Sequence, residues 1–214
     1  MRAPSPHCND DGVGGIQPSS CATSALSRVV QPRHLGPAAP SGLPLVADDF
    51  LLACVAARVD SVLSSCPVRP PSIDDSDLAV RSIDVDGPGW FDLDRWWLDE
   101  VVTALTSADF LHWLAHRLVV EPGNGIDLGA HALETPGAVS WHDDRRRGQR
   151  LGVVWFASHP PPTGGALLVA SPRGIVRISP VANRLAVFDA REPHAVGRVT
   201  KGVRRTLVGR TWLR

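Results

Sequence analysis

Hydrophobic positions recur every three or four residues along 47–66, in a run that contains neither proline nor glycine. This period places the apolar side chains on one face and predicts a helix, with Asp48 or Asp49 placed to cap its start. A second stretch with the same period covers residues 92–118, where Ser107 resembles an N-cap between two helices. The first half of the chain is therefore expected to contribute the helices of the fold.

Beyond residue 125 the helical period disappears, and short β-rich runs separated by proline- and glycine-containing turns replace it. A further short strand is predicted near residues 78–85. The runs predicted as strands after residue 125 are 126–133, 138–142, 151–157, 166–170, 175–178, 185–188, 194–199 and 205–213. Eight short strands at this spacing are typical of a double-sheet jelly roll. The predicted fold class is mainly β with N-terminal helices (α+β), built on a double-stranded β-helix core.

The first 45 residues differ in composition from the rest of the chain. Eighteen of the 45 are proline, glycine or serine, and none is aromatic. Such a segment buries too little apolar surface to offset its conformational entropy, so residues 1–45 are predicted to form a disordered tail. Residues 46–214 are predicted to form a single domain, with helical support over 46–124 and the jelly roll over 125–214. Deletion of the tail is accordingly expected to leave stability unchanged.

Charge is balanced overall but is divided unequally along the chain. Residues 1–144 carry 8 Arg and 20 acidic residues, whereas residues 145–214 carry 14 basic and 2 acidic residues. This asymmetry favours two halves that pack against each other, or a basic half that holds a small anion, over a nucleic-acid partner. No run of 18 apolar residues is present, so no membrane partner is expected.

Cysteine usage and the N-terminal segment bear on location. The four cysteines form neither a metal-ligand spacing nor a disulfide framework, and the first residues contain no apolar run typical of a secretory signal. A reducing, cytoplasmic location is therefore expected.

The most distinctive local sequence is Trp141-His142-Asp143-Asp144, at the end of a predicted strand. Because alternate side chains of a strand share a face, His142 and Asp144 would point to the same side. A His-x-Asp pair alone is expected by chance, but His194 opens a later strand about fifty residues on. Two imidazoles and one carboxylate form the facial triad of non-haem Fe(II) oxygenases. The alternative is a surface histidine, a turn aspartate and a histidine at a strand start.

A possible anion-binding pair follows His194. Arg204 lies ten residues after it, on a neighbouring predicted strand, and Thr206 shares the strand face of Arg204. A guanidinium offers a planar bidentate fork to a carboxylate, and the hydroxyl adds another donor. Arg205 is expected to point to the opposite face.

The ordered set His-x-Asp, about fifty residues, His, ten residues, Arg-x-Thr resembles the iron- and 2-oxoglutarate-dependent dioxygenases, specifically their prolyl-4-hydroxylase-like branch. The segments 150–158, 163–167 and 183–189 also resemble parts of that family, and the resemblance covers residues 107–214. One departure is that the family often has a Tyr three residues before the first metal-binding His, where this chain has Val139.

The resemblance implies that His142, Asp144 and His194 bind Fe(II), and that Arg204 and Thr206 hold the distal carboxylate of 2-oxoglutarate. It further implies O2 as second cosubstrate, with ascorbate as a possible addition. The implied activity is hydroxylation of an unactivated C–H bond of an amino acid, a peptide or a small metabolite. The motifs leave two alternatives open: a non-catalytic jelly-roll binding module, and a cupin-type metalloenzyme that does not use 2-oxoglutarate.

Overall fold

A computed structural model describes residues 24–36, 42–68, 80–83, 95–121, 123–145 and 149–212. Its helices are α1 (Ala25–Val29), α2 (Pro32–Leu35), α3 (Ala53–Ser65), α4 (Arg95–Leu105) and α5 (Ala108–Leu118). Its strands are β1 (Leu45–Ala47), β2 (Val80–Ser82), β3 (Ile126–Glu134), β4 (Val139–His142), β5 (Leu151–Phe156), β6 (Thr163–Gly164), β7 (Leu167–Ser171), β8 (Gly174–Ile178), β9 (Arg184–Asp189), β10 (His194–Val196), β11 (Val199–Lys201) and β12 (Val203–Thr211).

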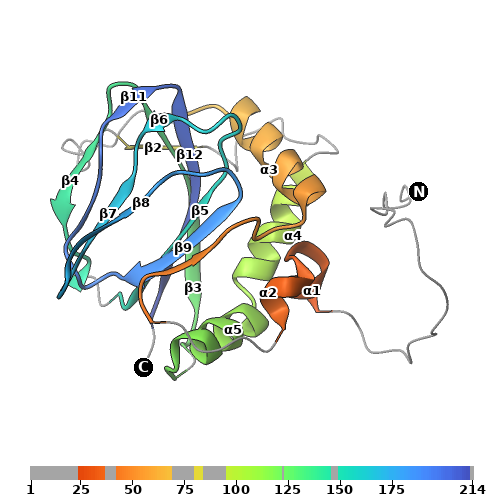
Figure 1. The fold of residues 1–214 in the computed structure, drawn as a ribbon. Coiled ribbons are helices and arrows are strands. Elements are labelled where there is room, and N and C mark those ends of the chain that lie inside the picture. Colours follow the sequence, from red (N-terminus) through yellow and green to blue (C-terminus); the bar gives the residue numbers. More distant parts are fainter. Residues whose placement is uncertain are drawn as a thin grey trace, which may run out of the picture.

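The strands form two main antiparallel sheets. A six-stranded sheet has the order β1-β9-β5-β12-β3-β2, and a four-stranded sheet has the order β4-β10-β7-β8, while β11 pairs with β6. The helices lie together on one side of the strands (Figure 1). The predicted double-sheet jelly roll with supporting helices is confirmed.

Both faces of the six-stranded sheet are covered, which explains why every residue of β5 is buried. Leu151, Val153 and Trp155 pack into the cluster that contains the helices. Val154 and Phe156, which alternate with them, pack against residues of the four-stranded sheet. Because successive strand side chains point to opposite faces, the central strands separate a helix-facing core from an inner space between the sheets.

The predicted helical periods are confirmed for α4 and α5, and the Ser107 side chain caps α5 by accepting a hydrogen bond from the backbone N–H of Phe110. The start predicted for the first long helix is wrong. Residues 45–47 form β1, and α3 begins at Ala53 without a side-chain cap. Asp48 instead lies in a bend that follows β1 and forms an ion pair with Arg184 of β9, the strand that pairs with β1.

Most predicted strands are confirmed, but the one predicted at 194–199 is divided into β10 and β11. These two strands belong to different sheets. The chain leaves the four-stranded sheet at Gly197, whose N–H donates to the carbonyl oxygen of Ala166, and then pairs with β6.

The prediction of a disordered tail over residues 1–45 is wrong where the structure describes that segment. Residues 24–36 contain α1 and α2, and Leu26, Val29 and Val30 are buried in the helix-facing core. The Ser24 side chain caps α1. One apolar turn flanked by proline-rich sequence is too short to give a periodic signal. The rest of the predicted tail lies outside the described residues, apart from 42–45.

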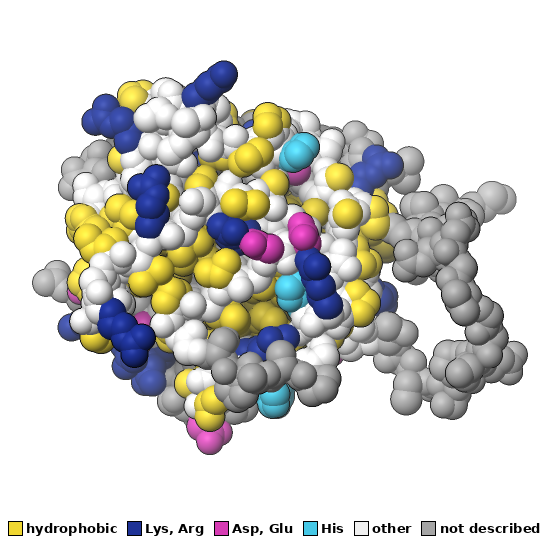
Figure 2. Space-filling view, in the orientation of Figure 1, with side chains coloured by type: hydrophobic (Ala, Val, Ile, Leu, Met, Phe, Trp, Pro, Cys, Tyr) yellow, Lys and Arg dark blue, Asp and Glu magenta, His cyan; other side chains and the backbone are white. Residues whose placement is uncertain are grey.

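Ion pairs between the acidic and the basic half of the chain support the view that the two halves pack together. Arg184 donates to Asp48, with Nη2 2.9 Å from Oδ2, and Arg205 donates to Asp60 of α3, with Nη2 2.9 Å from Oδ1. Figure 2 shows a face on which Arg and Lys side chains lie apart from one another rather than in a continuous basic patch. On that face the excess positive charge is therefore dispersed.

None of the helices in the described ranges is long and apolar enough to cross a membrane. The cytoplasmic location stays a prediction.

The buried face of α1 gives a testable prediction. Leu26→Ala should lower the free energy of unfolding by about 2–5 kcal/mol, because it removes a buried side chain and leaves a cavity. Deletion of residues 1–45 should lower the melting temperature further, because it removes the whole of α1. Arg28→Ala is the matched control: Arg28 is half exposed and its ion pair with Glu100 contributes about 1 kcal/mol at most. Equal melting temperatures for Leu26→Ala and the parent, measured by calorimetry, would contradict the packing of α1.

Candidate functional site

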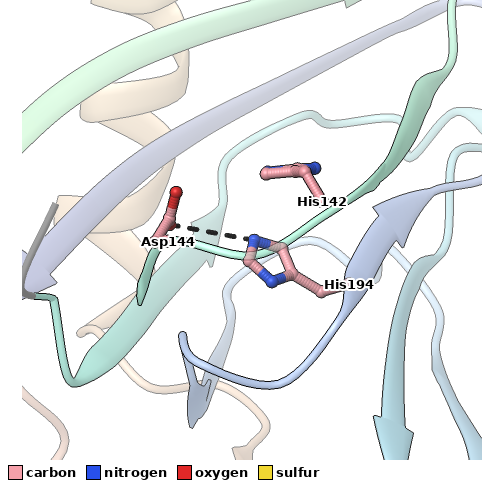
Figure 3. Close-up of side chains that lie close together, drawn as sticks. All are labelled: His142, Asp144 and His194. Atoms are coloured by element: carbon pink, nitrogen blue, oxygen red, sulfur yellow. Dashed lines mark ion pairs between the residues drawn. The ribbon is translucent and has the colours of Figure 1, made fainter. Parts of the chain in front are cut away.

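Three side chains that the sequence singles out lie together at the inner side of the four-stranded sheet. His142 ends β4 and His194 begins β10, and their Cα atoms are paired across the two strands. Their ring centroids are 4.3 Å apart, and Oδ2 of Asp144 lies 3.9 Å from Nε2 of His194 (Figure 3). One ligand atom from each of the three residues lies within 4.8 Å of the others. The spacing of the three groups fits a single metal ion.

Hydrogen bonds orient both imidazoles for metal binding. Nδ1 of His142 lies 2.9 Å from the carbonyl oxygen of Ser140, and Nδ1 of His194 lies 3.0 Å from that of Glu192. Since a carbonyl oxygen only accepts, Nδ1 is the donor in each ring, and in a neutral imidazole Nε2 is then the nitrogen with a free lone pair. Burial lowers the pKa of His194, which favours the neutral imidazole that a metal requires. The chemistry of this donor set fits Fe(II).

Asp144, rather than Asp143, joins the two imidazoles. β4 ends at His142, so strand alternation does not extend to these aspartates. The N–H of Asp144 instead donates to the carbonyl oxygen of Ala190 at 2.9 Å, which ties its backbone to the six-stranded sheet. Oδ1 of Asp143 accepts the N–H of Arg145 at 3.1 Å. The sequence therefore indicates the right aspartate, although the backbone tether and not the strand period positions it.

A cavity of about 330 Å³ lies between the two sheets and includes the three metal-binding candidates. Apolar side chains form most of its wall; they include Val154, Phe188 and Val208 from the six-stranded sheet and Val139, Leu167 and Val196 from the four-stranded sheet. Four further polar side chains reach it: His131, Asp143, Arg204 and Arg210. Sequence reasoning assigns no role to His131 or Arg210. The inward alternation of β3 and β12 is the signal that could have found them.

Arg204 is a buried cation without a counter-charge among the described residues. The residue is only 5% exposed, and burial lowers its pKa to about 10. Its Nε has no hydrogen-bond partner, and its Cζ lies 5.0 Å from the ring centroid of Phe156. Oγ1 of Thr206, two residues further on β12, is also buried and unpartnered. A carboxylate would satisfy both groups, so they fit the distal carboxylate of 2-oxoglutarate.

The expectation that the strand of Arg204 neighbours that of His194 is wrong. β12 lies in the six-stranded sheet and β10 in the four-stranded sheet, so the two residues line the cavity from facing sheets. Space for the Arg204 side chain comes from Gly165, which has a φ of +67°. A Cβ there would lie 3.2 Å from Cδ of Arg204 and 3.0 Å from Cγ2 of Val199. The Gly-Gly turn of the sequence thus has a packing role.

Arg205 points to the opposite face of β12, as the alternation predicts. Its Nε and Nη2 donate to Oδ1 of the buried Asp60 at 3.1 and 2.9 Å. The N–H of His159 donates to Oδ2 of the same carboxylate at 3.1 Å, and the N–H of Arg205 donates to Oγ of Ser158 at 2.6 Å. This network joins α3 to β12. Arg205 therefore stabilises the fold, and its substitution would not be a neutral control for the substitution of Arg204.

Comparisons with known proteins agree with this geometry. Residues 128–214 match the family model described as the 2OG-Fe(II) oxygenase superfamily. A prolyl-4-hydroxylase from Pseudomonas putida is structurally similar, with a TM-score of 0.56, 17% identity, and coverage of 81% of this chain and 89% of that one. An oxidoreductase of the 2OG-Fe(II) oxygenase family from Burkholderia pseudomallei gives a TM-score of 0.59, 18% identity, and coverage of 78% and 83%. No curated protein sequence matches the chain significantly.

The packing of Gly165 predicts a selective effect of Gly165→Ala. The new methyl group should displace the Arg204 side chain and weaken 2-oxoglutarate binding by about tenfold or more, in addition to a backbone cost of about 1–2 kcal/mol. Gly174→Ala is the matched control, since Gly174 also has a positive φ but a Cβ there would meet no atom within 4 Å. The control should lose stability without losing affinity in calorimetric titration. Equal affinities for both variants would contradict the role of Gly165.

The unpaired charge of Arg204 predicts opposite effects on stability and binding. Arg204→Met should raise the free energy of unfolding of the ligand-free protein by about 1 kcal/mol, because it removes a buried cation and keeps the packing volume. The same variant should lose about 2–5 kcal/mol of 2-oxoglutarate binding free energy. Arg177→Met is the control, because Arg177 is exposed on β8. A destabilised Arg204→Met variant that retains 2-oxoglutarate affinity would contradict this assignment.

Proposed function

Residues 128–214 belong to the 2OG-Fe(II) oxygenase superfamily, and on this premise we propose that the protein hydroxylates an unactivated C–H bond of an amino acid, a peptide or a small metabolite. One observation carries the proposal. A candidate facial triad and a buried, unpaired arginine line the same cavity. The first fits Fe(II) and the second fits a carboxylate, which are the two requirements for binding 2-oxoglutarate to a metal centre.

In this proposal His142, Asp144 and His194 hold the metal from one side. The Nδ1–H groups of the histidines and the backbone N–H of Asp144 are already engaged, so the ligand atoms are oriented before the metal arrives. When bound, Fe(II) activates O2 for the oxidation of 2-oxoglutarate and of the substrate. Three protein ligands leave coordination positions for exogenous groups.

Arg204 and Thr206 position the other end of 2-oxoglutarate. The guanidinium pairs with the distal carboxylate, and the Thr206 hydroxyl donates a further hydrogen bond. The overall reaction balances as 2-oxoglutarate, O2 and substrate C–H giving succinate, CO2 and substrate C–OH. One oxygen atom enters succinate and the other enters the product.

The wall of the cavity supports this chemistry by keeping water away from the buried Arg204. Val154, Phe188 and Val208 face Leu167 and Val196 across the space between the sheets. An apolar surrounding strengthens the attraction between Arg204 and a carboxylate, because few competing water dipoles remain.

The alternatives from the sequence are less well supported. A cupin-type metalloenzyme without 2-oxoglutarate has no need of an unpaired cation buried in the cavity that contains its metal site. A non-catalytic binding module would not require two imidazoles with free Nε2 atoms beside a carboxylate. Both alternatives predict that 2-oxoglutarate is not converted to succinate.

The proposed triad predicts the outcome of metal analysis. The protein should bind about one Fe(II) per chain under anaerobic conditions, and His142→Ala and His194→Ala should each abolish that binding. Fe(II)- and 2-oxoglutarate-dependent succinate formation should disappear in the same variants. Asp144→Asn and Asp143→Asn form the matched pair, and only the former should lose iron. Unchanged iron content in both histidine variants, or no succinate from the parent protein, would refute the proposed function.

A further inference from the structure

Arg210 is a second arginine on the inner face of β12. Arg204, Thr206, Val208 and Arg210 alternate along the strand and therefore share a face. Arg210 is half-buried and lines the cavity that contains the metal-binding candidates. It forms no hydrogen bond or ion pair with another described residue, and this includes Asp127, its direct neighbour on β3.

The backbone places Arg210 at the end of the cavity where Asp144 is tethered. Next to Arg210, the carbonyl of Thr211 accepts the N–H of Arg150, and the carbonyl of Arg150 accepts the N–H of Ala190. The carbonyl of Ala190 in turn accepts the N–H of Asp144. Arg204 lies six residues back along β12, about 20 Å away at 3.3 Å per residue. Arg204 and Arg210 therefore line opposite ends of the cavity.

An apolar surface connects Arg210 with the metal site. The residue opposite Arg210 on β5 is Gly152, and the ring of Phe188 fills the place where a Gly152 side chain would be. The same ring lies 4.8 Å from the ring of His194, centroid to centroid. A molecule held by Arg210 would thus lie over Phe188, with its far end beside a metal ligand.

No described carboxylate forms an ion pair with Arg210, although Asp143 also lines the cavity and Asp127 lies opposite Arg210 on β3. In the proposed function, Arg204 neutralises one carboxylate of 2-oxoglutarate and the metal neutralises the other. A half-buried guanidinium that remains favours an anionic group, and its planar fork suits a carboxylate. The volume of about 330 Å³ is at the lower limit for ligand pockets and must also hold 2-oxoglutarate, so the part of the substrate that enters the cavity is small.

We propose that Arg210 binds a carboxylate of the primary substrate, and that the substrate is a small carboxylic acid whose apolar part lies over Phe188. The proposal rests on the proposed function and narrows its range of substrates. It favours a free acid of amino-acid size over a residue within a long peptide, whose carboxylate is consumed in the amide bond.

The test uses matched acids and amides with the full chain loaded with Mn(II) and N-oxalylglycine, a non-reactive analogue of 2-oxoglutarate. Proline, valine, leucine and phenylalanine are each added as the free acid and as the primary amide, and the shift in melting temperature gives their affinities. At least one acid should bind about tenfold more tightly than its amide, as expected for loss of one charged contact. The same acid should accelerate succinate formation by the Fe(II) form.

Arg210→Gln should remove the difference between acid and amide while leaving N-oxalylglycine affinity within about twofold of the parent. Arg177→Gln, on the exposed side of β8, should retain the difference. The proposal is overturned if no acid exceeds its amide. It is equally overturned if Arg210→Gln weakens N-oxalylglycine itself, because Arg210 would then hold the cosubstrate. A parent protein that does not bind N-oxalylglycine at all would refute the proposed function as well.

Discussion

The burial of β12 on both faces is the constraint on which the rest of the structure depends. Successive residues of this strand must satisfy two different interiors, the helix-facing core and the space between the sheets. Arg204 and Arg205 show the consequence most clearly. Arg205 finds Asp60 of α3 on the helix side, whereas Arg204 enters the cavity and finds no described carboxylate. A register shift of one residue would exchange the two environments and remove the anion site.

The organisation of the site follows from charges and tautomers that are set before any ligand binds. Backbone carbonyls select the protonated Nδ1 of both histidines, and the carbonyl of Ala190 holds the backbone N–H of Asp144. Arg204 carries an unmatched charge at a cost to the folded state. Such preorganisation means that little rearrangement is needed when an anion and a metal enter together. The cost in stability is a consequence of having the site ready.

Local sequence is sufficient for the parts of the site that depend on spacing. Two-residue alternation places Arg204 and Arg205 on opposite faces of their strand, and the ordered motifs predict His142 and His194 as metal ligands. The resemblance to known dioxygenases then supplies the fold that makes these distant residues meet. What sequence does not reveal depends on contacts between remote segments. Nothing in the sequence around Asp60 indicates that its carboxylate pairs with Arg205 of β12.

The predictions that are wrong also fail because of contacts between remote segments. Asp48 resembles a helix cap, but its carboxylate pairs with Arg184, 136 residues away, and the helix begins only at Ala53. The segment at 24–36 resembles a polar, proline-rich tail, yet three of its side chains complete the helix-facing core. In each case a tertiary contact outweighs a weak local preference. Arg210 escapes sequence reasoning because an arginine near the end of a strand is ordinarily solvated, and only the cavity shows otherwise.

The short strand β1 has a consequence for how the protein behaves in concentrated solution. β9 is a six-residue, largely apolar strand, and without β1 one of its edges would present unpaired N–H and C=O groups. β1 covers that edge but is itself only three residues long, with Pro44 before it and Asp48 after it. A short strand bounded by a proline and a charge offers little template for another chain to extend. The segment therefore protects the molecule against edge-to-edge aggregation.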